Sequence, residues 1–298
     1  MSLLIRKIKQ NKEILADHSL WLEAFVTINI AFLTLDIYLA HSFNSFRKME
    51  EYAPFYFSMI APIFLTIGLV GKYRYHWLEV WTDIGYLVGY LSVGMGLVGV
   101  VLHLDSQFFS QRTIKSLVYG APFAAPLSYT GLGFLLIMNR MVADKGKDWA
   151  NWVIFFALGG FVGNFIFSLT DHAQNGFFHW SEWIPVASSA MAVGALISLF
   201  IAVYNRSYLY FCSFILLLQA IVGVLGFYLH AKSILNGPSI QLSENIINQA
   251  PLLAPLLFPN LVLLSAIGLW RLQNFLPSVI NKMPIPPSNK IEKDLTDW

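Results

Sequence analysis

The sequence predicts an all-α integral membrane protein, with about eight transmembrane helices built as a tandem duplication of a four-helix unit. Three observations predict this fold class: the apolar composition, eight long apolar runs, and two residue patterns that recur at nearly constant spacing. Of the 298 residues, 56% are hydrophobic and 12% are charged, whereas an ordinary soluble domain is about 25% charged. A single soluble core cannot hide so much apolar surface, so a lipid bilayer is the expected environment.

The two ends of the chain differ in composition from the rest. Residues 1–20 interleave four basic side chains with apolar ones, which is typical of an amphipathic helix on a membrane surface. They lack the continuous apolar core of a signal peptide. Residues 275–298 contain four prolines among mixed charges, a composition typical of a mobile tail.

Eight runs approach the roughly 20 apolar residues that a helix needs to cross a bilayer. They are Trp21–Ala40, Pro54–Gly71, Val80–Leu102, Tyr119–Met138, Trp152–Leu169, Ile184–Tyr204, Tyr208–Leu229 and Pro251–Leu272. The even-numbered runs open on or near proline, which is tolerated in the first turn of a helix. Arg140 follows the fourth run and is expected to extend its side chain to the interface.

The distribution of basic residues predicts the orientation of these spans. Fourteen Lys and Arg lie on the side that holds both termini and five on the other, together the 19 of the chain. Because cytoplasmic loops carry the excess of Lys and Arg, we expect a multi-pass protein of the cell membrane with both termini in the cytoplasm.

Two patterns indicate an internal repeat. The first is a histidine, nine residues and a glutamate, which occurs at His41–Glu51 and again 131 residues later at His172–Glu182. The second places two glycines and a histidine in register, in 96–103 and 223–230, each followed by an Ala-Pro-x-x-Ala-Pro-Leu segment. Such internal similarity is the signature of duplication.

The repeat predicts the domain organisation. The first four-helix repeat covers residues 21–143 and the second covers residues 152–274. Since each contains an even number of spans, both have the same orientation in the membrane. A parallel pseudo-two-fold axis, along the membrane normal, would relate them.

Four of the seven histidines end odd-numbered spans at matched positions near the outer face. A single histidine there is explained by capping of free helix carbonyls, but four at repeat-related positions also indicate a metal site. Two histidines and a carboxylate suit iron, and imidazole also suits copper and zinc. The predicted metal ligands are His41, Glu51 and His103 in the first repeat, and His172, Glu182 and His230 in the second.

A haem site is a variant of the same hypothesis. The four histidines could ligate haem b, and Gly99 and Gly226, one turn before a histidine, would leave space for its flat macrocycle. The alternative for these glycines is close packing between helices. The expected cofactor is therefore iron, copper or haem b, and Asp171 and Asp105 are further candidates, as extra ligands or as acceptors that orient a ring.

Other function classes lack their signatures. The net charge of +2 and the absence of a basic-aromatic patch argue against nucleic acid. A single cysteine, Cys212, excludes an internal disulfide, a four-cysteine iron–sulfur site and a Cys-x-x-Cys-His haem attachment. No Walker loop, Gly-x-Ser-x-Gly or His-Glu-x-x-His motif is present.

The leading hypothesis is a redox or metal-handling protein with a histidine–glutamate site at the outer face. One alternative is a small-solute or ion transporter, since duplicated halves and proline-interrupted helices fit that class. Another is a cofactor-free structural or assembly subunit that contacts the bilayer and other membrane subunits. The sequence does not decide whether the protein is an enzyme, or whether the histidines converge in space.

Overall fold

The computed structural model describes residues 14–201 and 205–275, and every regular element within them is helical. Residues 1–13 of the basic segment predicted at 1–20 lie outside these residues, and its last three belong to α2; all but the first residue of the tail predicted at 275–298 also lies outside. Seven helices are long and apolar enough to cross a membrane. Their main parts are α2 (His18–Ser42), α3 (Tyr52–Val70), α4 (Leu78–Asp105), α8 (Lys147–Gln174), α9 (Trp183–Ile201), α10 (Arg206–Leu235) and α12 (Leu257–Gln273). Three of the spans also include adjoining short helices and run over Met49–Tyr75, Trp180–Ile201 and Ala254–Gln273. The chain is thus an all-helical protein with the helices of a multi-pass membrane protein.

The fourth predicted span, Tyr119–Met138, differs from the structure. Helix α6 (Ile114–Tyr119) ends where the span should begin, the next seven residues are unwound, and α7 (Leu127–Met141) has 15 residues. At about 1.5 Å per residue α7 is about 22 Å long, shorter than the roughly 30 Å of a hydrocarbon core. Prolines, which cannot donate a backbone hydrogen bond, stand in the unwound stretch and at its end, so the helix starts late.

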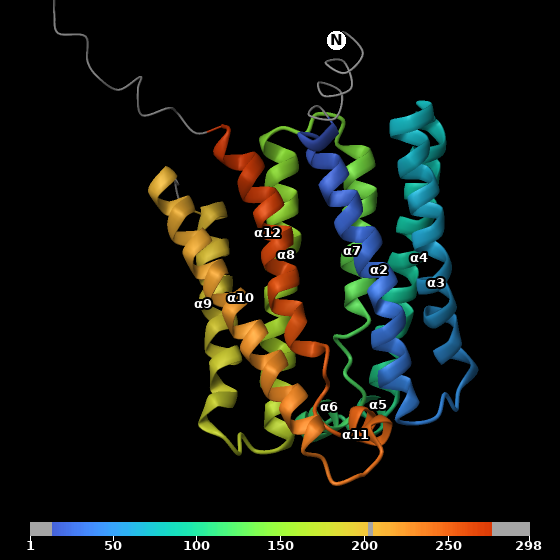
Figure 1. Ribbon diagram of the computed structural model, residues 1–298, viewed down its shortest axis with the longest axis vertical. Coiled ribbons are helices and arrows are strands. Elements are labelled where there is room, and N and C mark those ends of the chain that lie inside the picture. The colour runs from blue at the N-terminus through green and yellow to red at the C-terminus, as the bar shows by residue number, and fades with distance from the viewer. Residues whose placement is uncertain (1–13, 202–204, 276–298) are drawn as a thin grey trace, which may run out of the picture.

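The long helices form two groups that lie side by side (Figure 1). In the first, α2 packs on α3 and α4 packs on α7; in the second, α8 packs on α9 and α10 packs on α12. Contacts of α7 with α8, and of α2 with α12, join the groups. The short helices are η1 (Met49–Glu51), η2 (Gly71–Tyr75), α5 (Phe108–Gln111), η3 (Trp180–Glu182), α11 (Leu242–Asn248) and η4 (Ala254–Leu256).

Two ends of the bundle are named here by their contents. Helices α2, α4, α8 and α10 finish at one end, together with α5, α6 and α11, and this is the histidine end (Figure 1). The other end holds the start of α2 and the finish of α12, and is called the terminal end. Midway between them, Asn29 of α2 and Asn260 of α12 bond to each other through their side-chain amides, which links the two groups.

A buried ion pair holds the terminal end of the first group. Arg140 of α7 donates to both carboxylate oxygens of Glu23 on α2, and neither side chain is exposed. The expectation that Arg140 extends to the membrane interface was therefore wrong, because its guanidinium finds its partner inside the bundle.

Beyond α7, Lys145 donates to the carbonyl of Asn139 at 2.6 Å. Burial, with neighbouring Lys72, lowers the pKa of Lys145 to about 8.

Candidate functional site

The first two predicted ligands of each group lie against each other at the histidine end. His41, in the last turn of α2, places Nδ1 3.6 Å from a carboxylate oxygen of Glu51. His172, in the last turn of α8, places Nδ1 3.7 Å from a carboxylate oxygen of Glu182. All four side chains are between 11% and 20% exposed, so each pair is screened from most solvent and can form a charge-assisted contact.

The same turn brings each glutamate back to its histidine. The backbone is left-handed at Ser45 and Phe46, and again 131 residues later at Gly176 and Phe177. In both turns the second of these residues donates its N–H to the carbonyl of the site histidine, at 3.1 and 3.0 Å. The short helices η1 and η3 follow, and each carries its glutamate at the last position. The nine-residue spacing seen in the sequence is thus the length of one compact loop.

The second histidine of each group is held by an unwound backbone carbonyl. Nδ1 of His103, on α4, lies 2.9 Å from the carbonyl oxygen of Pro122, and Nδ1 of His230, on α10, lies 2.7 Å from that of Pro251. Because a carbonyl only accepts, Nδ1 must be the protonated nitrogen. In the neutral ring Nε2 then keeps a free lone pair, which is the arrangement typical of metal-binding histidine.

The first group brings its two histidines together, since the rings of His41 and His103 have centroids 6.3 Å apart and planes at 72°. In the second group, the ring of His172 contacts that of Phe177, with centroids 6.2 Å apart. The ion pairs and ring contacts of these histidines stay within one group, in the part of the chain that the structure describes. The structure therefore presents two candidate sites, one for each group.

Two asparagines belong to these sites and were not predicted. Asn44 donates its side-chain amide to Glu51 at 2.9 Å, which leaves the other oxygen of Glu51 buried and without a hydrogen-bond partner among the described residues. Asn175, with its amide nitrogen turned toward Glu182, donates to that carboxylate at 3.1 Å. Both asparagines stand three residues after the site histidine, at the same 131-residue spacing. That recurrence was a usable signal in the sequence.

The glycines proposed to make room for haem face proline rings. A Cβ atom at Gly99 would lie 2.7 Å from Cβ of Pro126, and one at Gly226 would lie 2.9 Å from Cβ of Pro255. The neighbouring segment therefore occupies the space beside both glycines, and leaves none there for a macrocycle. Their contacts are those of closely packed membrane helices.

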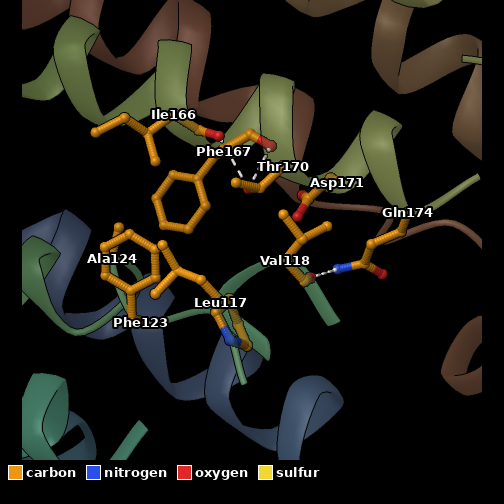
Figure 2. Close-up of a pocket in the computed structure, with 10 residues that line it drawn as sticks. Leu117, Val118, Phe123, Ala124, Ile166, Phe167, Thr170, Asp171 and Gln174 are labelled. Carbon is orange, nitrogen blue, oxygen red and sulfur yellow. Dashed lines mark hydrogen bonds between the residues drawn. The ribbon is translucent and has the colours of Figure 1, made fainter. Parts of the chain in front are cut away.

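Asp171 lines a cavity between the two groups (Figure 2). The cavity is small, about 10 Å³ or roughly the space of one water molecule, and lies between α8 and the segment formed by α6 and the unwound residues that precede α7. Across it, Gln174 donates to the carbonyl of Val118 at 2.8 Å. Asp171 thus sits one residue from His172 but in the junction with the other group, and has no contact with Glu182 among the interactions of the described residues.

The donor chemistry of each site is two imidazoles and one carboxylate. Within residues 14–201 and 205–275, no three or more His, Cys, Asp or Glu side chains already enclose a position for a metal ion. In each site the carboxylate and the first imidazole are in contact, and the second imidazole keeps a free ring nitrogen. Compared with protein-family models, curated proteins and solved structures, the chain matches none.

Proposed function

We propose that this protein consists of two copies of one four-helix unit, residues 21–143 and 152–274, and that each copy binds one transition-metal ion at the histidine end. The ligands would be His41, Glu51 and His103 in one copy and His172, Glu182 and His230 in the other. A redox or metal-handling role follows from that donor set.

Recurrent contacts support the duplication. The histidine–glutamate ion pairs, the left-handed turns, the histidine–proline bonds and the glycine–proline packing all occur once in each copy. The helices correspond in order, α2 with α8, α3 with α9, α4 with α10 and α7 with α12. Unrelated helices would have no reason to reproduce four kinds of contact at matched positions.

One observation carries the metal assignment: a carboxylate lies against the first imidazole while a carbonyl fixes the tautomer of the second. When two donor atoms each bind one ion at about 2.0–2.2 Å, the distance between them is close to the 3.6 Å that separates His41 Nδ1 from a carboxylate oxygen of Glu51. Two rings bound to one ion at about 2.0–2.1 Å, at the tetrahedral or octahedral angles of such sites, would have centroids about 4.5–5.2 Å apart, whereas those of His41 and His103 are 6.3 Å apart. Metal binding then requires the second ring to close on this pair.

Metal analysis of the detergent-purified protein tests the assignment. We expect stoichiometric iron, copper or zinc, half of it lost in His41→Ala/His103→Ala, half in His172→Ala/His230→Ala, and all of it in the quadruple variant. The control is His76→Asn, because His76 is exposed at the terminal end and left-handed, a conformation that asparagine tolerates. Metal-free wild type purified without chelators, or unchanged metal in the quadruple variant, would refute the proposal.

Transport is the second candidate, and the unwound segments before α7 and η4 favour it. Interrupted helices form the substrate sites of many transporters. Proteoliposomes loaded with a fluorescent metal indicator separate the two roles. Metal that enters the lumen would be cargo, whereas metal that binds without crossing would be a resident cofactor.

The orientation is proposed from the basic residues: both termini in the cytoplasm and the histidine end outside. Ile240 is fully exposed in the loop before α11, and Asp144 is exposed between α7 and α8. In intact cells we expect a membrane-impermeant maleimide to label Ile240→Cys and not Asp144→Cys. The only native cysteine, Cys212, is buried and gives little background. The reverse labelling pattern would invert the topology.

A further inference from the structure

Two buried amides in the second group each leave one polar atom without a partner. Asn164 on α8 is 4% exposed and Gln219 on α10 is 1% exposed. Among the described residues, Nδ2 of Asn164 finds no acceptor and Oε1 of Gln219 finds no donor. An unpaired polar group is unfavourable in a membrane interior, so both atoms require a hydrogen-bond partner that no described residue supplies.

The two amides lie at similar depth inside the same four-helix unit. Helices α8 and α10 both pack against α9 and against α12, so they face each other across the axis of the unit. Asn164 is eight residues from His172, and Gln219 is 11 residues from His230, which at about 1.5 Å per residue places them about 12 and 16 Å from the histidine site. One unpaired atom is a donor and the other an acceptor.

A polar face leads from these amides to the second histidine site. Asn164, Ser168 and His172 are spaced four residues apart, so they follow one face of α8. Ser168 is buried. The positions 131 residues earlier, on α2, carry Leu33 and Ile37 behind His41. The first histidine site therefore has an apolar face behind it, whereas the second has a polar one.

The polar path from His172 past Ser168 to Asn164 and Gln219, called the track below, is closed toward the terminal end. Phe161, the next residue inward on α8, is fully buried, and Leu216 on α10 is 3% exposed. In the first group, the hydroxyls of Thr27, Ser92 and Thr130, Nε1 of Trp81 and Nε of Arg140 also have no partner among the described residues. The hydroxyls can rotate to a carbonyl of their own helix, and the two nitrogens belong to the start of α4 and the finish of α7, away from the histidine end.

We propose that ordered water fills this track, from His172 to Asn164 and Gln219, and that it is entered from the histidine end. A water molecule both donates and accepts, so ordered water satisfies Gln219 Oε1 as well as Asn164 Nδ2. The second histidine site then exchanges water and protons through a blind internal track that the first site lacks. This inference does not depend on metal binding, because it rests on the amides.

Silver ion, which is close to water in size and reacts with thiols in contact with water, tests the track. In a Cys212→Ala background we compare Ser168→Cys with Ile37→Cys, its counterpart on α2. Reaction in the folded, metal-free protein is read from the loss of maleimide labelling after unfolding in detergent. We expect silver to react with Ser168→Cys at least tenfold faster than with Ile37→Cys.

Removing the amides should empty the track. Adding Asn164→Leu and Gln219→Leu to Ser168→Cys should lower its silver reactivity to that of Ile37→Cys, and Gln219→Met alone should lower it severalfold if the double change prevents folding. Equal rates for Ser168→Cys and Ile37→Cys would overturn the proposal. So would a rate that Gln219→Met leaves unchanged, since the water would then not depend on the amide.

Discussion

Replacing Arg140 with methionine is expected to destabilise the protein by about 3–5 kcal/mol, because the change leaves the Glu23 carboxylate buried without a counter-ion. Glu23 is fully buried, and accepts from Arg140 at 2.6 Å and from Asn139 at 3.3 Å. The guanidinium also lies over the ring of Trp81, 4.1 Å from its centroid, and donates to the Trp81 carbonyl. One side chain thus joins α2, α4 and α7. Unfolding in mixed micelles measures the loss.

A double-mutant cycle separates the ion pair from the packing of the two side chains. Glu23→Met should cost about as much as Arg140→Met, since it leaves the guanidinium unpaired. The double variant should cost less than either, because two apolar side chains of similar length replace two charges. If each single variant loses less than about 1 kcal/mol, water reaches the pair and its burial does not set the stability.

The fold class follows from composition and hydropathy, but the fourth span does not. Hydropathy sees that residues 119–138 are apolar, and cannot see whether their backbone is helical. Pro122 and Pro126 decide that point, because neither can donate to a helical hydrogen bond. The same unwound backbone supplies the carbonyl that orients His103. The prolines that interrupt the helix therefore also position a backbone carbonyl of the candidate site.

The contacts between His41 and Glu51, and between His172 and Glu182, follow from a spacing that recurs in the sequence. Glu23 gave no such signal. The position 131 residues later is Ile154, and a lone acidic residue near the start of an apolar run resembles one at the headgroup level. Only the approach of α7 to α2 shows that it meets Arg140. Recurrence in the sequence finds the contacts that occur in both groups of helices, and tertiary packing alone finds those that occur in one.

Replacing Gly133 with alanine should destabilise the protein by about 1–3 kcal/mol, because the two helices must separate to admit a methyl group. A Cβ at Gly133 of α7 would lie 2.5 Å from the carbonyl oxygen of Gly89 and 2.9 Å from the backbone nitrogen of Val93, both on α4. These are backbone atoms, so no side-chain rotation relieves the overlap. Small residues allow this close approach in membranes, where packing drives helix association.

Gly131 provides a matched control on the same helix. A Cβ there has no neighbour within 4 Å, so Gly131→Ala keeps the gain in helix propensity, up to about 1 kcal/mol, without an overlap. We expect unfolding in mixed micelles to show opposite shifts for the two variants. If Gly133→Ala is as stable as Gly131→Ala, α4 and α7 do not approach at their backbones. Opposite shifts would instead establish that the backbones of α4 and α7 are in close contact at Gly133.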